Sequence, residues 1–138
     1  MLKEEAGLVA VQPKGTTKIA TKSTGDRAEA LALEHLLRHG LALVCRNYRV
    51  ARGPRARGGE IDLILRERDG TLVFVEVRSR AVASYGGALA SVSAAKQRSL
   101  VFAAQHYLTR LARVPPCRFD VVSVEGTALQ WVRAAFDA

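Results

Sequence analysis

Apolar residues dominate two neighbouring segments of the chain, 60–66 and 71–78, and a short polar stretch separates them. Their length and their content of Val, Ile, Leu and Phe predict two β-strands. The polar stretch, residues 68–70, predicts a hairpin turn. Acidic residues interrupt the apolar pattern at three positions: Glu60, Asp62 and Glu76.

The length of the hairpin loop decides which side chains face one another. A three-residue loop, with Gly70 in the left-handed conformation, sets one register. That register joins Arg66 with Leu72, Ile64 with Phe74, and Asp62 with Glu76. The Cβ atoms of Asp62 and Glu76 then lie about 5 Å apart, and like charges so placed destabilise a sheet unless a cation lies between them. Divalent ions such as Mg²⁺ take oxygen ligands of this kind.

A second register stays open at this point. A two-residue turn would pair Asp62 with Val77 and send the carboxylates of Asp62 and Glu76 to opposite faces of the sheet. We favour the first register because it places Phe74 opposite Ile64 and gives the two carboxylates a shared partner.

The remaining segments predict two helices and three further strands. They are, in chain order, a helix from about Gly25 to Gly40, a strand at 41–50, a helix of about twenty residues ending before Pro115, and strands at 118–124 and 128–136. Ser23 or Thr24 is the expected N-cap of the first helix. This order predicts an α/β fold, an αβββαβ(β) sandwich around a mixed sheet, in which 71–78 and 118–124 run parallel.

Composition indicates a single domain. The chain has 138 residues and 49% of them are hydrophobic, which suffices for one modest core. We place the domain at 25–138 and expect residues 1–24, with lysines scattered among Gly, Thr and Ser, to form a flexible basic tail. No apolar run reaches the roughly 18 residues of a membrane span, and the N-terminus lacks the apolar block of a signal peptide. We therefore expect a cytoplasmic protein with no membrane partner.

The charge balance favours a polyanionic partner. The formal net charge is +8, with 16 Arg against 5 Lys, and each phosphate that such residues neutralise releases counterions. Arginines crowd into the segment that leads to Glu60: Arg46, Arg49, Arg52, Arg55 and Arg57. Such a run is usually a solvated loop. Its position directly before the acidic strand favours contact with nucleic-acid phosphates instead.

One acidic residue falls on the apolar side of the first predicted helix. A helical wheel groups Glu29 with Leu33, Leu36 and Leu37. In one interpretation the Glu29 carboxylate interacts with the positive N-terminal end of the helix and extends into water. In the other it is a third acid of the metal site, beside Asp62 and Glu76. The sequence leaves both interpretations open.

Three motifs in this order resemble a known family. They are Gly59-Glu60-Ile61-Asp62-Leu63-Ile64, Phe74-Val75-Glu76-Val77-Arg78-Ser79-Arg80 and Arg118-Phe119-Asp120-Val121-Val122. Together they resemble the bacterial YraN-like family, which belongs to the restriction-endonuclease-like superfamily with the PD-(D/E)XK signature. The similarity covers most of residues 25–136. The chain is also similar to archaeal Holliday-junction resolvases, which act as dimers, so the resemblance implies a restriction-endonuclease-like fold and a homodimer as one possible arrangement.

The resemblance also implies a metal site for Mg²⁺ or Mn²⁺. Asp62 and Glu76 are its ligands, with the Val77 carbonyl as a further ligand, and Glu29 matches the acid of the first helix. Arg78 stands where the superfamily has the lysine of its motif. Because an arginine stays protonated, Arg78 suits a phosphate clamp better than a general base.

Other polar residues have both a functional and a plain interpretation. Lys96 and Gln97 match polar positions beside the active centre in that superfamily, and an exposed helical turn explains them equally well. Arg78 could form an exposed ion pair with Glu60 in the favoured register. Asp120 either points toward the site or accepts a hydrogen bond in the core. The residues expected to contact nucleic acid are Arg49, Arg52, Arg55, Arg57, Arg80, Lys96 and Gln97.

The resulting hypothesis is a Mg²⁺-dependent endonuclease that cleaves phosphodiester bonds of branched or structured nucleic acid, with DNA favoured. Two alternatives remain. One is a catalytically inactive nucleic-acid-binding module of the same fold, and the other is an interaction protein that uses its basic surface and needs no metal.

Overall fold

The computed structural model describes residues 20–54, 58–79 and 92–138, with side chains from residue 25 onward. Arg55, Arg57 and Arg80 lie outside the described residues. Within these ranges the helices and strands follow one another in the predicted order. They are α1 (Ala20–Arg38), β2 (Ala42–Val50), β3 (Gly59–Arg66), β4 (Leu72–Ser79), α3 (Ala94–Leu108), β5 (Cys117–Glu125) and β6 (Ala128–Phe136).

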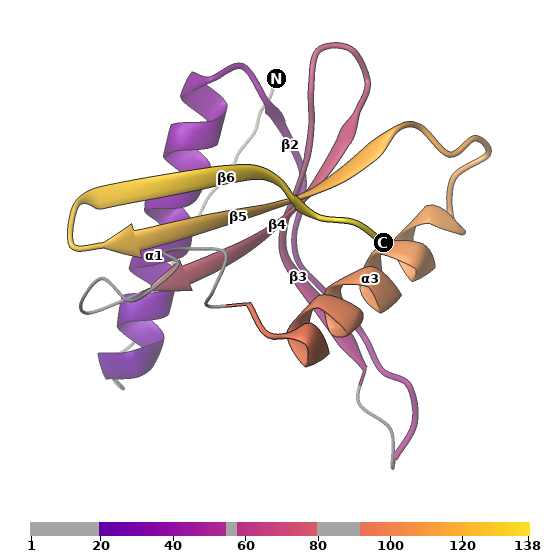
Figure 1. Cartoon of the computed structure of the whole chain (residues 1–138), viewed down its shortest axis with the longest axis horizontal. Helices are drawn as coiled ribbons and strands as arrows, with labels where there is room; N and C mark the ends of the chain where they lie inside the picture. Colours follow the sequence, from indigo (N-terminus) through magenta and orange to yellow (C-terminus); the bar gives the residue numbers. More distant parts are fainter. Residues whose placement is uncertain (1–19, 55–57, 80–91) are drawn as a thin grey trace.

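The strands form one mixed sheet in the order β2-β3-β4-β5-β6 (Figure 1). Neighbouring strands are antiparallel except β4 and β5, which run parallel. The chain passes through α3 between these two strands, as the sequence predicts for a parallel pair. The expected fold class, a mixed sheet in an αβββαββ order, is confirmed.

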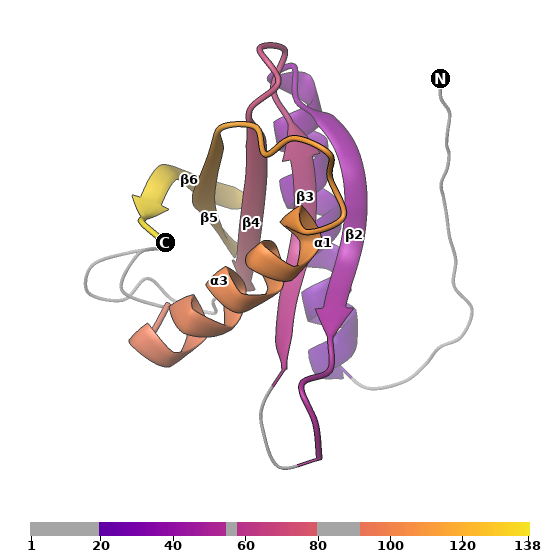
Figure 2. The same cartoon turned by 90° about the vertical axis from the view of Figure 1, so that its right-hand side faces the viewer.

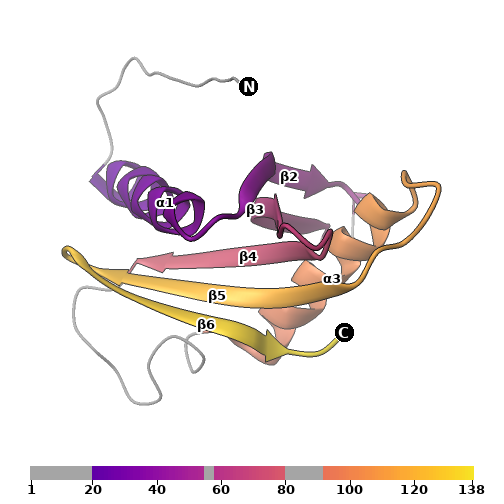
Figure 3. The same ribbon diagram turned by 90° about the horizontal axis from the view of Figure 1, so that it is seen from above.

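Helices α1 and α3 cover opposite faces of the sheet (Figures 2 and 3). Ile64 and Phe74 pack beneath α3 together with its residues Leu100 and Ala103. The neighbouring positions on the same strands face α1, because successive side chains of a strand alternate between faces. They include Leu63, Leu65, Val73 and Val75. Both faces of the central strands are therefore buried.

The β3–β4 hairpin adopts the favoured register. Ile64 lies opposite Phe74 and Arg66 opposite Leu72. Gly70 has a φ of 96°, and the Glu67 N–H donates to the Thr71 carbonyl at 2.9 Å, which closes the three-residue loop. A residue with a Cβ would be strained at that φ. The alternative two-residue turn is not adopted.

Helix α1 differs from the prediction at its start and on its buried side. It begins at Ala20, so the backbone of residues 20–24 is helical rather than part of a tail. The residues that it buries against the sheet are Ala28, Ala32 and Leu36, whereas Leu37 is 45% exposed. Small alanines allow the helix to lie close to the sheet. The prediction assigned leucines, not alanines, to the buried side of the helix and was wrong for Leu37.

The predicted end of α1 at Gly40 is confirmed, whereas α3 is shorter than predicted and ends at Leu108, well before Pro115. Gly40 has a φ of 93°, and backbone N–H groups of Gly40 and Leu41 close the end of α1 on the carbonyls of Leu37 and Leu36. Helix α3 begins after Ser93, whose hydroxyl accepts from the Lys96 N–H at 3.1 Å, and has 15 residues, fewer than expected. Neither described helix is long and apolar enough to cross a membrane.

Candidate functional site

Asp62 and Glu76 meet where the paired part of β3 and β4 ends. The recorded pairs run from Arg66 with Leu72 to Leu63 with Val75, so these two acids come next on each strand. Asp62 is not held by a ladder partner at this point. Its Oδ2 instead accepts the Val77 N–H at 2.8 Å, which turns the carboxylate of β3 toward β4.

Burial and mutual repulsion govern the charge of this pair. Glu76 is only 3% exposed, and burial, with the Asp62 charge next in importance, raises its pKa to about 7. Burial also raises the pKa of Asp62, while the Val77 N–H and a side-chain hydrogen bond with Glu76 oppose that rise. The carboxyl of Glu76 therefore gives up its proton near neutral pH rather than near pH 4.5, and a bound cation would favour that loss.

Two cations approach the same oxygen of Glu76. Arg78, two residues further along β4, places Nη1 3.2 Å from Oε2, and Lys96, in the first turn of α3, places Nζ 3.8 Å from it. The resemblance to the superfamily placed both Arg78 and Lys96 beside the acidic pair, and both lie next to Glu76. The plain interpretation of Arg78 as a partner of Glu60 is not realised, because Glu60 pairs with Arg49 at 3.3 Å.

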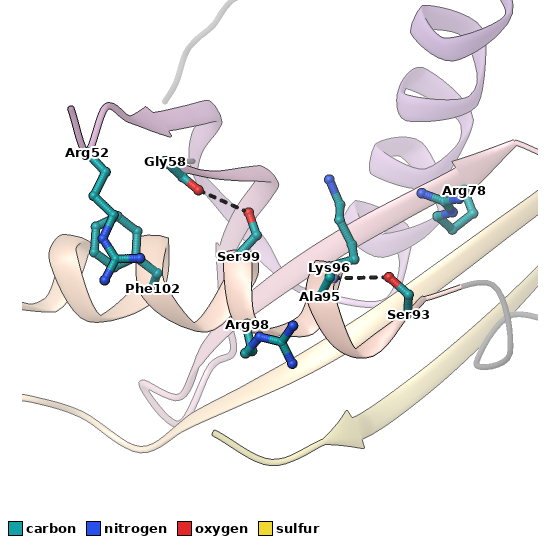
Figure 4. Close-up of a pocket in the computed structure, with 9 residues that line it drawn as sticks. All are labelled: Arg52, Gly58, Arg78, Ser93, Ala95, Lys96, Arg98, Ser99 and Phe102. Carbon is teal, nitrogen blue, oxygen red and sulfur yellow. Dashed lines mark hydrogen bonds between the residues drawn. The ribbon is translucent and has the colours of Figure 1, made fainter. Parts of the chain in front are cut away.

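A basic pocket of about 500 Å³ opens beside these cations (Figure 4). We call it the α3 pocket, and its lining residues are Arg52, Gly58, Arg78, Ser93, Ala95, Lys96, Arg98, Ser99 and Phe102. Among the described residues that line it, four are cationic and none is acidic. Arg98 and Phe102 were not predicted. The helical spacing of positions 95, 98, 99 and 102 could have predicted that these residues lie on one side of α3.

A second pocket, of about 540 Å³, lies on the α1 side and has the opposite character. Its lining residues are Gly25, Asp26, Glu29, Asn47, Arg49 and Glu60, and we call it the α1 pocket. Burial, and then the Asp62 charge, raises the pKa of Glu29 to about 7. Glu29 is thus close enough to sense Asp62. Among the described residues, however, no three side chains of His, Cys, Asp or Glu lie close enough together to bind one metal ion.

The predicted nucleic-acid contacts divide between the two pockets. Arg52 and Lys96 line the α3 pocket, whereas Arg49 lies in the α1 pocket against Glu60. Gln97 donates its side-chain amide to the Val92 carbonyl at 3.2 Å and so supports the start of α3. Val77, expected to offer its carbonyl, contributes its N–H to Asp62.

Asp120 belongs to a separate network on the other face of the sheet. It pairs with Val75, which faces α1, and is 1% exposed. Its carboxylate accepts from Arg118 Nε at 3.0 Å, from Trp131 Nε1 at 2.9 Å and from the Ala134 N–H at 2.9 Å. These donors hold an irregular part of the β5–β6 pairing, so Asp120 has a structural role.

Comparison with known proteins places the chain among similar bacterial proteins. A UPF0102 protein of Methylibium petroleiphilum is 66% identical over 120 residues, covering 87% of this chain and 98% of its relative. A UPF0102 protein of an Acidovorax species is 64% identical over 118 residues, covering 86% and 87%. The solved structure of Pyrococcus furiosus SfsA in complex with Ca²⁺ is 13% identical, with a TM-score of 0.32 over 92% of this chain and 76% of that one, too low to carry an argument.

The family model described as "Uncharacterised protein family UPF0102" matches residues 28–124. This range contains α1 from Ala28 onward, the hairpin with Asp62 and Glu76, helix α3 and nearly all of β5. The resemblance to the YraN-like family is thereby confirmed, and the chain belongs to family UPF0102.

Proposed function

We propose that this protein is a Mg²⁺- or Mn²⁺-dependent endonuclease that acts in the cytoplasm on branched or structured nucleic acid, DNA in particular. The observation that carries the proposal is the pairing of Asp62 with Glu76 beside Arg78, Lys96 and the α3 pocket. Paired carboxylates next to a cationic pocket are the two parts that phosphodiester hydrolysis requires, a metal site and a phosphate site.

The donor set suits a hard divalent cation. Two carboxylates come from adjacent strands, and their mutual charge contributes to the raised pKa of Glu76. Mg²⁺ is commonly bound through one or two carboxylates, with water and substrate phosphate completing its octahedral shell. When bound, such an ion activates water and offsets charge on the scissile phosphate. The Val77 N–H holds the Asp62 carboxylate in place for this role.

Lys96 and Arg78 have different tasks in the proposed reaction. The ammonium group of Lys96 is a compact charge from α3 that can stabilise the negative charge developing on the phosphate. The planar guanidinium of Arg78 is suited to two hydrogen bonds with phosphate oxygens. Lys96 therefore supplies, from the helix, the lysine that the strand motif lacks at Arg78.

One observation favours a second candidate, a nucleic-acid-binding module without catalysis. Glu76 Oε2 already has two cationic neighbours, Arg78 and Lys96, which can neutralise the acid without a metal. In that case the α3 pocket would still bind phosphate, and the carboxylates would serve to position the cations.

Cleavage assays separate the two candidates. Junction, flap and single-stranded DNA and RNA substrates are incubated with Mg²⁺ or Mn²⁺ and with wild type, Glu76→Gln, Lys96→Ala or Lys96→Arg. An endonuclease loses roughly 100- to 1,000-fold of its cleavage rate in Glu76→Gln and in Lys96→Ala, and Lys96→Arg recovers part of it. The control Glu34→Gln alters an exposed acid that pairs with Arg38 on α1 and retains the wild-type rate.

The other outcomes are equally distinct. Binding without cleavage by any metal-loaded wild-type sample favours the inactive module. The absence of both cleavage and nucleic-acid binding at moderate salt contradicts the proposal and leaves the interaction protein.

A further inference from the structure

The α3 pocket extends along helix α3. Its helical lining extends from Ala95 through Ser99 to Phe102, residues that lie on one side of α3. The seven steps from Ala95 to Phe102 rise about 10 Å along the helix axis. One strand of a duplex carries a phosphate about every 3.4 Å of axis, and a strand drawn out along a groove spaces its phosphates about twice as widely, so this length corresponds to about two to three phosphates.

Cations mark both ends of the pocket and the interval between them (Figure 4). Arg78 and Lys96 occupy the end near Glu76, and Arg52 occupies the far end against the Phe102 ring. Arg98 comes from the part of α3 between these ends. The α1 pocket differs, since Asp26, Glu29 and Glu60 line it with a single arginine. Of the two pockets, the α3 pocket is the one suited to a polyanion.

Packing fixes the distance between the two walls of the pocket. The Arg52 guanidinium lies 4.6 Å from the centre of the Phe102 ring, a contact that orders an otherwise mobile side chain. Ser99 Oγ donates to the Gly58 carbonyl at 3.5 Å, which ties α3 to the entry of β3. A Cβ on Gly59 would lie 2.5 Å from the Ser99 carbonyl oxygen, so only glycine permits this close approach.

We propose that a single strand of the nucleic-acid substrate lies along the α3 pocket, with about two to three consecutive phosphates between the Lys96 and Arg78 end and the Arg52 end. The inference rests on the proposed function for the nature of the ligand, and it adds the path of the strand. Arg98 and Arg52 contact phosphates that flank the scissile one. The substrate enters on the α3 face, and the α1 pocket lies outside its path.

Salt dependence of binding tests the path directly. The logarithm of the binding constant falls with the logarithm of salt concentration by about 0.7 per neutralised phosphate for single strands and about 0.9 for duplexes. Loss of one phosphate contact therefore reduces that slope by about 0.7 to 0.9. Binding is measured by fluorescence anisotropy in EDTA, where metal-dependent cleavage cannot proceed, with labelled DNA of about 12 nucleotides, a typical site size.

The variants form a matched set. Arg52→Ala removes an arginine that lies over Phe102, and Arg133→Ala removes one that lies 4.1 Å over Trp131, outside the pocket. Arg98→Ala removes a pocket arginine that makes no recorded ion pair with the described residues. We expect the slope to fall by about 0.7 on single strands for Arg52→Ala and for Arg98→Ala, and to stay unchanged for Arg133→Ala. Circular dichroism verifies that each variant is folded.

The result separates this inference from the proposed function. Equal slopes in all three variants and wild type, with DNA bound, overturn the path along α3 whether or not the protein cleaves. Reduced slopes for Arg52→Ala and Arg98→Ala support the path even when no metal yields cleavage. Slope loss in Arg133→Ala alone would place the strand on the α1 face instead.

Discussion

Two buried acids on adjacent strands, Glu76 on β4 and Asp120 on β5, have opposite surroundings. Asp120 accepts three kinds of donor, a guanidinium, an indole N–H and a backbone N–H. Among the described residues, Glu76 Oε2 has two cationic side chains at 3.2 and 3.8 Å, and the Asp62 carboxylate lies beside Glu76. A buried carboxylate whose oxygens accept hydrogen bonds from several donors stabilises the fold. A buried carboxylate that lies beside another carboxylate is suited to bind a cation.

The largest expected difference concerns stability. Asp120→Ala leaves the partly buried Arg118 with Glu67 as its remaining carboxylate partner and should cost about 3–5 kcal/mol of unfolding free energy. Glu76→Gln should cost nothing or stabilise the fold in metal-free buffer, because it removes a buried charge without emptying space. Urea unfolding in EDTA measures both. Equal losses in the two variants would show that Glu76 is a structural acid like Asp120.

A second prediction concerns pH. The pKa of Glu76 is about 7 in the fold against an ordinary value of 4.5, so the fold binds this proton more tightly than the unfolded chain does. Its contribution to stability is complete below about pH 4.5 and is lost as the pH rises through 7. We expect the Tm of wild type in EDTA to fall over this window more than the Tm of Glu76→Gln.

A third prediction concerns the effect of Mg²⁺ on thermal stability at different pH values. At the upper end of the window the ion replaces the lost proton, so added Mg²⁺ should raise the Tm of wild type and leave that of Glu76→Gln unchanged. Identical pH profiles for the two proteins would mean that Glu76 does not carry the raised pKa.

A smaller effect is expected from the packing that holds α3 against β3. Gly59→Ala places a Cβ 2.5 Å from the Ser99 carbonyl oxygen and should cost about 1–3 kcal/mol, because the neighbours are backbone atoms that cannot rotate away. Gly25→Ala is the matched control, since nothing lies within 4 Å of its added Cβ in α1. It should stabilise the helix by about 0.5–1 kcal/mol. Thermal unfolding compares them, and an unaffected Gly59→Ala would contradict the close approach of α3.

The sequence predicted the features that local rules determine. The apolar runs predicted both hairpin strands, and the three-residue loop with Gly70 predicted their register and hence the adjacency of Asp62 and Glu76. The start of α1 was missed because the first turns show no clear apolar stripe, and small alanines rather than leucines pack on the sheet.

Contacts between distant segments could not be read from the chain. The resemblance placed Lys96 beside the active centre, but local patterns could not, because Lys96 is twenty positions beyond Glu76 and only the docking of α3 brings the two side chains together. Asp120 had two interpretations because a strand pattern does not reveal that Trp131 and Ala134, on the next strand, donate to it. Arg49 and Arg52 are close in sequence, yet they line different pockets.

The most direct test of the account is the binding of Mn²⁺ to the metal-free protein, followed by isothermal titration at pH 7.5 together with the released protons. Wild type and Glu34→Gln should bind Mn²⁺ with release of a fraction of a proton, because the pKa of Glu76 is about 7 and its carboxyl is therefore still partly protonated at pH 7.5 when no metal is bound. Asp62→Asn and Glu76→Gln should lose that binding. Equal Mn²⁺ affinity in Glu76→Gln and wild type would contradict the claim that these two carboxylates form a metal site.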